Sequence, residues 1–257
     1  DPRGSTLVDS VERPVTYALR SAADVTCSSV EGSLTGLRFD VRTPRGEIRV
    51  RSALIGQANV YNILAAVATA VALDVSFSAI ETGIAAVTAV PGRFEIVSDA
   101  TDEVAVVIDF AHTDDALRLL LESARPLVPG RLITVFGCGG DRDRSKRPLM
   151  GAVAARLSDL VVVTSDNPRS EDPAAIIEDT VAGIETGHAD QQGDRASVRD
   201  VGEKTPFMTI VDRAEAISHA VGLACRGDVV IIAGKGHETY QVIAGETVPF
   251  NDTAVAR

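Results

Sequence analysis

The second half of the chain alternates between short apolar runs and amphipathic stretches, and this rhythm predicts its fold. Five β-rich apolar runs are expected as strands, at residues 104–108, 132–136, 160–164, 208–211 and 229–233. Helical patterns lie between them, at about 114–127, 148–158, 173–186 and 212–225. Apolar strands without alternation are typical of a parallel sheet that is buried on both faces. The pattern therefore predicts a doubly wound α/β domain.

The first half of the chain has a different pattern. Segments 35–41 and 47–51 alternate apolar and polar residues around a turn-forming sequence at 43–46, which predicts a β-hairpin. Residues 1 to about 57 are expected to form short β segments, followed by helices at about 58–73 and 76–87. Pro91-Gly92 then interrupts the pattern. The expected domains are 1–90 and 91–257, and the polar stretch 187–204 is expected to be an exposed loop or a weak helix-loop insertion.

Composition narrows the class of protein. A chain of 257 residues with 45% hydrophobic residues can form one large domain or two of ordinary size. Its net charge of −11 argues against sequence-independent nucleic-acid binding. Three separated cysteines without a C-x-x-C pair indicate a reducing compartment. No apolar stretch reaches about 18 residues and no signal-peptide pattern opens the chain, so we expect a soluble, cytoplasmic protein without a membrane partner.

Four loops that follow predicted strands are rich in charged residues and glycine, at 109–113, 137–144, 166–169 and 234–238. The carboxyl ends of neighbouring parallel strands meet at one edge of a sheet, where open α/β sheets bind ligands. The most informative loop is Asp166-Asn167-Pro168-Arg169. Its carboxylate, amide and guanidinium suit a zwitterionic amino acid, and the alternative is a solvated turn. Together the loops predict a binding site.

Single residues in these loops also allow simpler interpretations. His112 could cap a helix, and Arg144, Lys146 and Arg147 could be a solvated charge run before the next helix. Cys138 has no base partner at a suitable spacing and is interpreted as a small buried residue. No G-x-x-x-x-G-K-[ST] motif occurs, so these 257 residues contain no P-loop for phosphate binding.

With these motifs in view, the chain resembles the Mur ligases, and within them the type that adds meso-diaminopimelate. The resemblance covers almost the whole chain. It is carried by GQANVYNILAA at 56–66, PGRFE at 91–95, IDFAHT at 108–113, FGCGGDRDRSKRPLM at 136–150, SDNPRSEDP at 165–173 and AGKGHETYQ at 233–241. The last three segments are long and specific.

The resemblance implies ATP-dependent amide formation in peptidoglycan precursor synthesis. In this family ATP converts a carboxylate of UDP-MurNAc-L-Ala-D-Glu to an acyl phosphate, which the amine of the third amino acid attacks. ATP and Mg²⁺ are the implied cofactors, meso-diaminopimelate is the implied amino acid, and a monomer is expected. The implied fold is a Rossmann-like C-terminal domain with a mainly parallel sheet, preceded by the C-terminal part of a central ATPase domain made of a β-hairpin and helices.

The resemblance also implies the residues of two sites. The expected amino-acid site consists of Arg142, Asp166, Asn167, Pro168, Arg169, Gly234 and Glu238. The expected ATP contacts are Asn59 and Asn62, to the adenine, and Arg93 and Asp109, made across the domain junction, with His112 nearby. In this family the D-N-P-R form accompanies meso-diaminopimelate, whereas lysine-adding relatives lack the Arg. The chemistry agrees, because a guanidinium fork can bind the second carboxylate that lysine lacks.

The chain also departs from the family pattern. Phe110 and Asp114 stand where the family commonly has Tyr and Pro. The family's amino-terminal domain and the P-loop half of its central domain do not occur in this sequence. We therefore expect a fragment that holds the amino acid without turning over ATP, and no catalytic residue is assigned. Two alternatives stay open: another Mur-type ligase, lysine-adding or folylpolyglutamate-like, and a stand-alone amino-acid- or nucleotide-binding domain.

Overall fold

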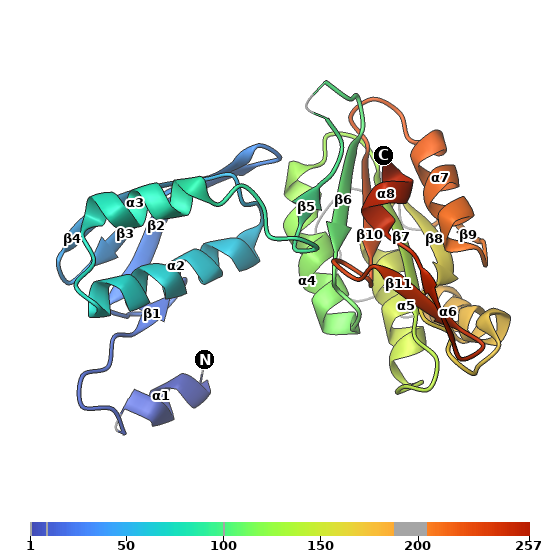
Figure 1. Ribbon diagram of the computed structural model, residues 1–257, viewed down its shortest axis with the longest axis horizontal. Coiled ribbons are helices and arrows are strands. Elements are labelled where there is room, and N and C mark those ends of the chain that lie inside the picture. Colours follow the sequence, from blue (N-terminus) through green and yellow to red (C-terminus); the bar gives the residue numbers. More distant parts are fainter. Residues whose placement is uncertain (1, 9, 100, 188–204) are drawn as a thin grey trace. The chain divides into compact units, whose positions relative to one another are not determined.

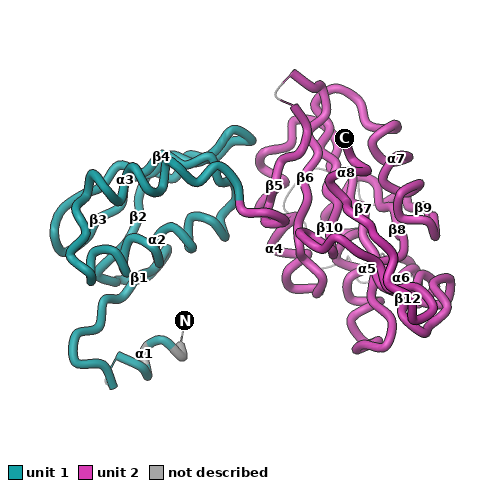
Figure 2. The backbone as a smooth tube through the Cα atoms, in the orientation of Figure 1, with its two compact units in different colours: residues 1–89 teal, residues 90–257 magenta. Residues whose placement is uncertain are grey.

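A computed structural model describes residues 2–8, 10–99, 101–187 and 205–257. The chain divides into two compact units, residues 1–89 and 90–257 (Figure 2). Each unit has its own sheet and its own apolar core. Residues 188–204, which make up nearly all of the expected loop insertion, lie outside the described residues.

The first unit contains a four-stranded sheet in the order β1-β2-β3-β4. Its strands are β1 (Tyr17–Ala18), β2 (Val25–Ser33), β3 (Gly36–Thr43) and β4 (Gly46–Ser52). The expected hairpin is confirmed, because β3 and β4 pair antiparallel with Thr43 opposite Gly46. Alternation along β3 buries Phe39 and Val41 and exposes Arg38 and Asp40. One face of this sheet is therefore apolar.

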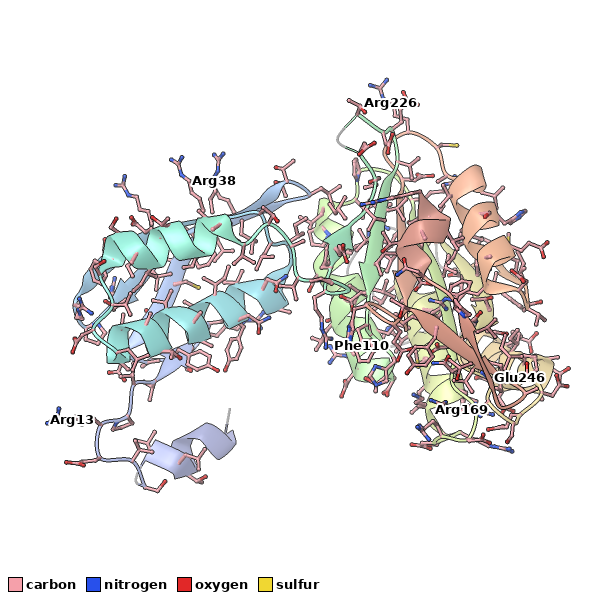
Figure 3. All side chains as sticks on the ribbon, in the orientation of Figure 1. Arg13, Arg38, Phe110, Arg169, Arg226 and Glu246 are labelled. Atoms are coloured by element: carbon pink, nitrogen blue, oxygen red, sulfur yellow. The ribbon has the colours of Figure 1, made fainter. Side chains whose placement is uncertain are left out.

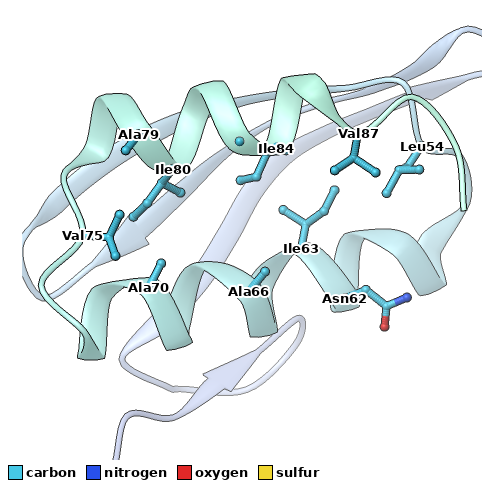
Figure 4. A pocket seen from close by; sticks show the side chains of 11 residues that line it. Leu54, Asn62, Ile63, Ala66, Ala70, Val75, Ala79, Ile80, Ile84 and Val87 are labelled. Carbon is cyan, nitrogen blue, oxygen red and sulfur yellow. The ribbon is translucent and has the colours of Figure 1, made fainter.

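Two helices cover that apolar face, close to the positions expected from the sequence. They are α2 (Gln57–Ala72) and α3 (Phe77–Ala86). Ser76 begins α3, because its side chain accepts a hydrogen bond from the amide of Ala79. Leu64 and Val67 of α2 are fully buried in the core of this unit. A groove of about 360 Å³ with mostly aliphatic walls lies between the two helices (Figure 4).

The expectation of β segments throughout residues 1–57 is wrong at the beginning. Residues Pro2–Val8 form a helix, α1. Proline suits the first turn of a helix, where its missing N–H has no intrahelical partner to lose. The end of α1 is closed by the amide and hydroxyl of Ser10, which both donate to the carbonyl of Leu7. Such local bonds leave no trace in hydrophobic periodicity.

The second unit contains a six-stranded sheet in the order β5-β6-β10-β7-β8-β9. Its strands are β5 (Glu95–Ile96), β6 (Ala105–Asp109), β7 (Leu132–Cys138), β8 (Leu160–Ser165), β9 (Phe207–Thr209) and β10 (Val229–Ala233). All five strands expected from the sequence are present and pair in parallel. Only the unexpected edge strand β5 is antiparallel to its neighbour in this sheet as described. The predicted parallel α/β architecture is confirmed.

Helices lie on both faces of this sheet (Figure 1). They are α4 (Asp114–Ala124), which continues as a 3₁₀ turn (Arg125–Leu127), α5 (Lys146–Leu157), α6 (Pro173–Gly187), α7 (Arg213–Leu223) and α8 (Asp252–Ala256). Val135 packs in one core with Ile217 of α7. The next residue but two along β7, Cys138, points the other way and contacts Met150 of α5 and Thr180 of α6. Both faces of β7 are thus covered by helices.

A hairpin near the carboxyl end was not expected from the sequence. It consists of β11 (Tyr240–Ile243) and β12 (Glu246–Pro249), which pair antiparallel. Ala244 and Gly245 between them both have positive φ, 50° and 81°, which matches the twist of a two-residue hairpin turn. None of the helices in the described ranges is long and apolar enough to cross a bilayer.

Two leucines of α4 test the assignment of the buried face. Leu121 is fully buried, whereas Leu119 is 53% exposed. Leu121→Ala should lower the free energy of unfolding by about 2–5 kcal/mol, because it leaves a cavity under α4. Leu119→Ala, the matched control on the same helix, should change it by less than about 0.5 kcal/mol. Urea unfolding measures both, and equal losses would contradict the packing described.

Candidate functional site

Four loops meet at one edge of the second sheet, as expected from the sequence. The strands that they follow, β6, β10, β7 and β8, are successive neighbours. The amide of Gly234, after β10, donates to the carbonyl of Asp109 at 3.1 Å. The amide of Gly140, after β7, donates to the carbonyl of Asn167 at 2.9 Å. Figure 3 shows Phe110 and Arg169 toward this end of the unit and Arg226 at the opposite end.

A buried ammonium connects two of these loops. The side chain of Lys235 is fully buried, and its Nζ donates to Asp166 Oδ1 at 3.1 Å and to Asn167 Oδ1 at 3.0 Å. It also donates to Glu238 Oε2 at 3.2 Å. The Asn167 amide nitrogen donates to the same Glu238 oxygen at 3.1 Å. Three of the expected amino-acid-site residues are thus brought together around one cation.

Lys235 was not among the expected site residues. Two of its three partners, Asp166 and Asn167, lie 69 and 68 positions earlier in the chain, so the sequence around Lys235 does not show that it is buried. The one available signal is its place between two glycines, directly after a buried strand. A lysine in such a position has its ammonium close to the loops of the neighbouring strands.

The loop after β8 is not the solvated turn that we kept as an alternative. Asp166 and Asn167 are buried, with 8% and 5% of their surfaces exposed. Arg169 has a φ of 54°, a conformation that is uncommon for a residue with a side chain. Its Nη1 donates to the carbonyl of Gly140 at 2.7 Å and, more weakly, to that of Asn167 at 3.4 Å. The guanidinium is therefore held at one corner by backbone oxygens.

The β11–β12 hairpin supports this loop from the other side. The amide of Arg169 donates to the carbonyl of Val242, and the amide of Val242 donates to Asn167 Oδ1. The buried side chain of Gln241 donates to the carbonyl of Asp166 at 2.8 Å. The unexpected hairpin thus fixes both the backbone of the loop and the orientation of the Asn167 amide.

The loops after β7 and β8 approach each other closely at two glycines. A Cβ on Gly140 would overlap the carbonyl oxygen of Pro168, so only glycine allows this approach. A Cβ on Gly139 would lie 3.0 Å from Arg169 Nη1 and 3.8 Å from Arg142 Cγ. The side chains of Arg142 and Arg169 therefore pass beside Gly139. Arg142 is exposed and donates to the carbonyl of Asp141 at 3.0 Å.

The interpretation of residues 144–147 as a solvated charge run before the helix is wrong. Helix α5 begins at Lys146, and the Arg147 side chain is only 1% exposed. Arg147 pairs with Glu171 at 2.8 Å and with Asp179 at 2.9 Å. Arg144 is exposed but also pairs with Glu171, at 2.8 Å. These ion pairs connect the segment after β7 to α6, through Asp179, and to the end of the loop after β8, through Glu171.

This network lowers the pKa of one carboxyl strongly. Hydrogen bonds from Arg147 and from the amide of Asp141 lower the pKa of Glu171 from 4.5 to about 2. Asp141 in turn accepts hydrogen bonds from the amide and hydroxyl of Ser170, which lower its pKa as well. Glu171 therefore stays ionised at any neutral or mildly acidic pH, and it ties both loops to the buried Arg147.

The expected ATP residues of the second unit lie around Phe110. The guanidinium of Arg93 lies 5.0 Å from the centre of the Phe110 ring, and the rings of His112 and His237 lie 4.7 and 5.4 Å from it. Asp109 accepts from the amides of Phe94 and Ala111, both at 2.8 Å. Burial raises the pKa of the Asp109 carboxyl, against the opposing effect of these donors and of Arg93.

His112 does not cap the helix that follows it. Its ring is exposed, and Nδ1 lies 2.9 Å from the carbonyl oxygen of Phe110. The capping group of α4 is the hydroxyl of Thr113, which accepts from the amide of Ala116. The carbonyl of His112 accepts from Lys146 Nζ at 2.8 Å. These bonds leave most of the imidazole accessible at the sheet edge.

Asn59 and Asn62, the other two expected ATP residues, belong to the first unit. Asn59 is buried at the start of α2, where its Nδ2 donates to the carbonyl of Ile55 at 2.8 Å. Its Oδ1 accepts from the exposed Asn62, at 3.3 Å. Asn62 contributes an amide to the otherwise aliphatic groove between α2 and α3 (Figure 4).

Cys138 is a buried residue, as interpreted from the sequence. It is 2% exposed, and burial raises the pKa of its thiol above the ordinary value. A protonated thiol is a poor nucleophile, so Cys138 has a packing role. Within the part of the chain that the structure describes, no group of three or more His, Cys, Asp or Glu side chains could hold a metal ion. The described residues therefore offer no cage of protein ligands that could hold Mg²⁺ by itself.

Models of known families match both units of the chain. The Mur ligase glutamate ligase domain matches residues 92–236, and the Mur ligase middle domain matches residues 2–70. The first match covers more than half of the 257 residues. The chain belongs to the Mur ligase family.

Curated relatives of high similarity share one name, UDP-N-acetylmuramoyl-L-alanyl-D-glutamate--2,6-diaminopimelate ligase. That of Solibacter usitatus is 49% identical over 241 residues, which are 94% of this chain and 45% of the relative. That of Gloeobacter violaceus is 46% identical, over 100% of this chain and 49% of the relative. The chain thus spans about half the length of the curated relatives it matches.

Solved structures give the same picture of the fold. A 2,6-diaminopimelate ligase of this name aligns with a TM-score of 0.62 and 38% identity, covering 94% of this chain and 46% of that one. A folylpolyglutamate synthase of Mycobacterium tuberculosis also aligns with a TM-score of 0.62, at 21% identity, covering 82% of this chain and 45% of that one. At that identity the second likeness shows the fold alone.

The buried ammonium is testable by substitution. Lys235→Met should lower the free energy of unfolding by about 3–5 kcal/mol, because it leaves two carboxylates without their buried partner. Arg226→Met is the control, since Arg226 is 85% exposed and lies 3.9 Å from Glu103. It should change stability by about 0–1 kcal/mol. Denaturant unfolding compares the two, and a Lys235 variant as stable as the control would contradict the network.

The lowered pKa of Glu171 predicts a pH dependence. A carboxyl with a lower pKa in the folded state stabilises the fold above its unfolded pKa, and loses this effect as pH falls from about 4.5 to about 2. Glu171→Gln should therefore lower the melting temperature at neutral pH, and the difference from wild type should shrink across that range. Glu178→Gln, an exposed change on α6, should leave the melting temperature unchanged throughout. A gap for Glu171→Gln that stays constant with pH would refute the assignment.

Proposed function

We propose that this chain is the amino-acid-binding part of an ATP-dependent ligase that joins meso-diaminopimelate to UDP-MurNAc-L-Ala-D-Glu. This is a step of peptidoglycan precursor synthesis. Curated relatives named as 2,6-diaminopimelate ligases, 49% and 46% identical, support the proposal. Residues 1–90 are then the end of the central domain and 91–257 the C-terminal domain, in keeping with family matches at 2–70 and 92–236.

The observation that carries the proposal is the free edge of the Arg169 guanidinium. Nη1 has two carbonyl acceptors, whereas Nε and Nη2 have no hydrogen-bond partner among the described residues. That edge presents two parallel N–H groups, which is the geometry that binds a carboxylate through two hydrogen bonds. Because Nη1 and the backbone are already fixed, little conformational entropy is lost when a ligand binds.

Glu238 supplies the complementary charge. Its Oε2 accepts from Lys235 and Asn167, while Oε1 has no partner in the described part of the chain. A carboxylate oxygen held in this way can accept a hydrogen bond from an ammonium. An amino acid with two carboxylates and two ammonium groups therefore suits these loops. We assign its binding to Arg142, Asp166, Asn167, Pro168, Arg169, Gly234 and Glu238.

The same residues explain a preference for meso-diaminopimelate over lysine. The two amino acids differ by one carboxylate, which lysine lacks. A site that binds this carboxylate through Arg169 leaves a fixed guanidinium edge unpaired when lysine is bound. Buried polar groups without partners discriminate strongly between such analogues.

In the proposed reaction, the γ-phosphoryl group of ATP passes to a carboxylate of the UDP-linked substrate and forms an acyl phosphate. The amine of the amino acid attacks the acyl carbon, loses a proton and displaces phosphate, so that an amide bond forms. The contribution of this chain is positioning, because the loops fix where the amine is held. We place the reaction in the cytoplasm, since three separated cysteines suit a reducing compartment.

ATP contacts are proposed for Asn59, Asn62, Arg93, Asp109 and His112. The Arg93 guanidinium and the exposed His112 ring beside Phe110 offer a cation and flat rings to a nucleotide. The sequence contains no P-loop and the described residues form no cage of protein ligands for a metal, so the residues of this chain are given contact and positioning roles alone. We propose that this chain by itself binds the amino acid without turning over ATP.

Substitution of Arg169 tests the proposal. Arg169→Ala should weaken meso-diaminopimelate binding by about 2–5 kcal/mol, because it removes one partner of a desolvated charge pair. Titration calorimetry on the 257-residue chain measures this, with Arg156→Ala on the exposed side of α5 as control. L-lysine should bind wild type more weakly than meso-diaminopimelate does, and Arg169→Ala should narrow that difference. Unchanged affinity in the Arg169 variant would remove this residue from the site.

A further inference from the structure

A second fully buried cation lies behind the amino-acid loops. Arg213, the first residue of α7, has no exposed side-chain surface. Its Nη2 donates to the carbonyl of Ala233 at 3.1 Å, and its Nη1 makes a longer bond to the carbonyl of Ser165 at 3.4 Å. Ala233 ends β10 and Ser165 ends β8. One guanidinium thus contacts the carboxyl ends of two strands.

These two strands are not neighbours, because β7 lies between them. Ladder hydrogen bonds therefore connect β8 and β10 only through β7. Arg213 is a direct link between them at the sheet edge. The residues that directly follow its two carbonyl partners are Asp166 and Gly234, both members of the proposed amino-acid site.

The guanidinium is held from its other side by α8. Arg213 Nε and Nη2 donate to Asp252 Oδ1 and Oδ2, both at 2.8 Å, and the Asp252 side chain is also fully buried. This is a bidentate pair, the most directional form of ion pair. Burial acts to lower the pKa of Arg213, but the attraction and hydrogen bonds of Asp252 raise it above its ordinary value. The guanidinium therefore stays charged, and the two hydrogen bonds to Asp252 fix its orientation.

We propose that Arg213 and Asp252 are positioning residues, which set the spacing between the Asp166 loop and the Gly234 loop and so make α8 part of the amino-acid site. For the identity of the ligand, this inference rests on the proposed function. The two loops carry the groups that meet at Lys235, so a change in their spacing alters the placement of Asp166, Asn167 and Glu238 together. The pair acts through these residues and touches no ligand itself.

A matched pair at the opposite edge of the sheet provides the control. Arg131 precedes β7 and Asp228 precedes β10, and the Arg131 side chain donates to Asp228 Oδ2 at 2.9 and 2.6 Å. The Asp228 side chain is 5% exposed. This pair also connects strand ends through an arginine and an aspartate, but at the edge away from the four loops. Asp228→Asn therefore reproduces the loss of such a pair without touching the site.

The first arm of the test compares binding by Asp252→Asn and Asp228→Asn. Calorimetry with meso-diaminopimelate on the 257-residue chain, well below the melting temperature of each variant, should give a Kd raised at least tenfold for Asp252→Asn. The fitted stoichiometry should stay near one, which shows that the measured molecules are folded. Asp228→Asn should bind like wild type although its melting temperature falls. Wild-type affinity in Asp252→Asn would overturn the inference.

A conservative variant separates positioning from folding. Arg213→Lys keeps the charge opposite Asp252, but one ammonium lacks the planar fork that reaches both carbonyls and both carboxylate oxygens. It should therefore be more stable than Arg213→Met and still show the tenfold loss of affinity. Full affinity in Arg213→Lys would mean that charge alone is sufficient, and would contradict a role in spacing.

The second arm needs no ligand, so it separates failure of this inference from failure of the proposed function. Amide hydrogen exchange should accelerate at Gly234 and Arg169 in Asp252→Asn, because both amides donate between segments at this edge. It should accelerate less at these amides in Asp228→Asn. Equal protection there in the two variants would overturn the inference whether or not wild type binds meso-diaminopimelate. If wild type does not bind meso-diaminopimelate but the exchange pattern is as expected, the proposed function alone is contradicted.

Discussion

The ammonium of Lys235 is the interaction on which the site depends. It is fully buried and contacts Asp166, Asn167 and Glu238, which come from loops on two different strands. Removing a charge from water is unfavourable unless its partners are close and well oriented, so the two loops have little freedom to separate. The Asn167 amide gains a single orientation from this contact, because its oxygen faces Lys235 and its nitrogen faces Glu238.

The sheet edge is built with further buried cations. Arg147 connects the loop after β7 to α6 through Glu171 and Asp179, and Arg213 connects the ends of β8 and β10 to α8. Both arginine side chains are buried beneath the loops and do not lie at the exposed loop tips. The carboxyl ends of parallel strands are not joined by short turns, because each strand continues into its own loop. Buried ion pairs give these ends the fixed spacing that a rigid binding site requires.

Much of the second unit could be predicted from the sequence. Continuous apolar runs indicated the five parallel strands. Because loops that follow parallel strands lie at the same edge of a sheet, the charged loops could be placed together. The β11–β12 hairpin was missed because its strands are short and mostly exposed, so they produce no clear period. The helix over Pro2–Val8 was missed because it is short and because the bonds from Ser10 that close it leave no trace in hydrophobic periodicity.

The loops of the candidate site could be predicted from the sequence, whereas the buried charges behind them could not. Long-range partners decide whether a charge is buried, and local sequence does not contain them. Arg147 was interpreted as solvated because its partners, Glu171 and Asp179, lie 24 and 32 positions later. Lys235 and Arg213 escaped notice for the same physical reason. Asp166 and Asn167 could be proposed from the sequence because their loop carries its chemistry in adjacent residues, and their place in an amino-acid site stays a prediction.

A crystal structure of this chain with meso-diaminopimelate would show whether the loops around Lys235 and Arg169 bind this amino acid. The Nε and Nη2 edge of Arg169 should lie within hydrogen-bond distance of the carboxylate farthest from the reacting amine, with Glu238 beside an ammonium. A ligand bound away from the loop after β8, or one whose far carboxylate points into solvent, would contradict it.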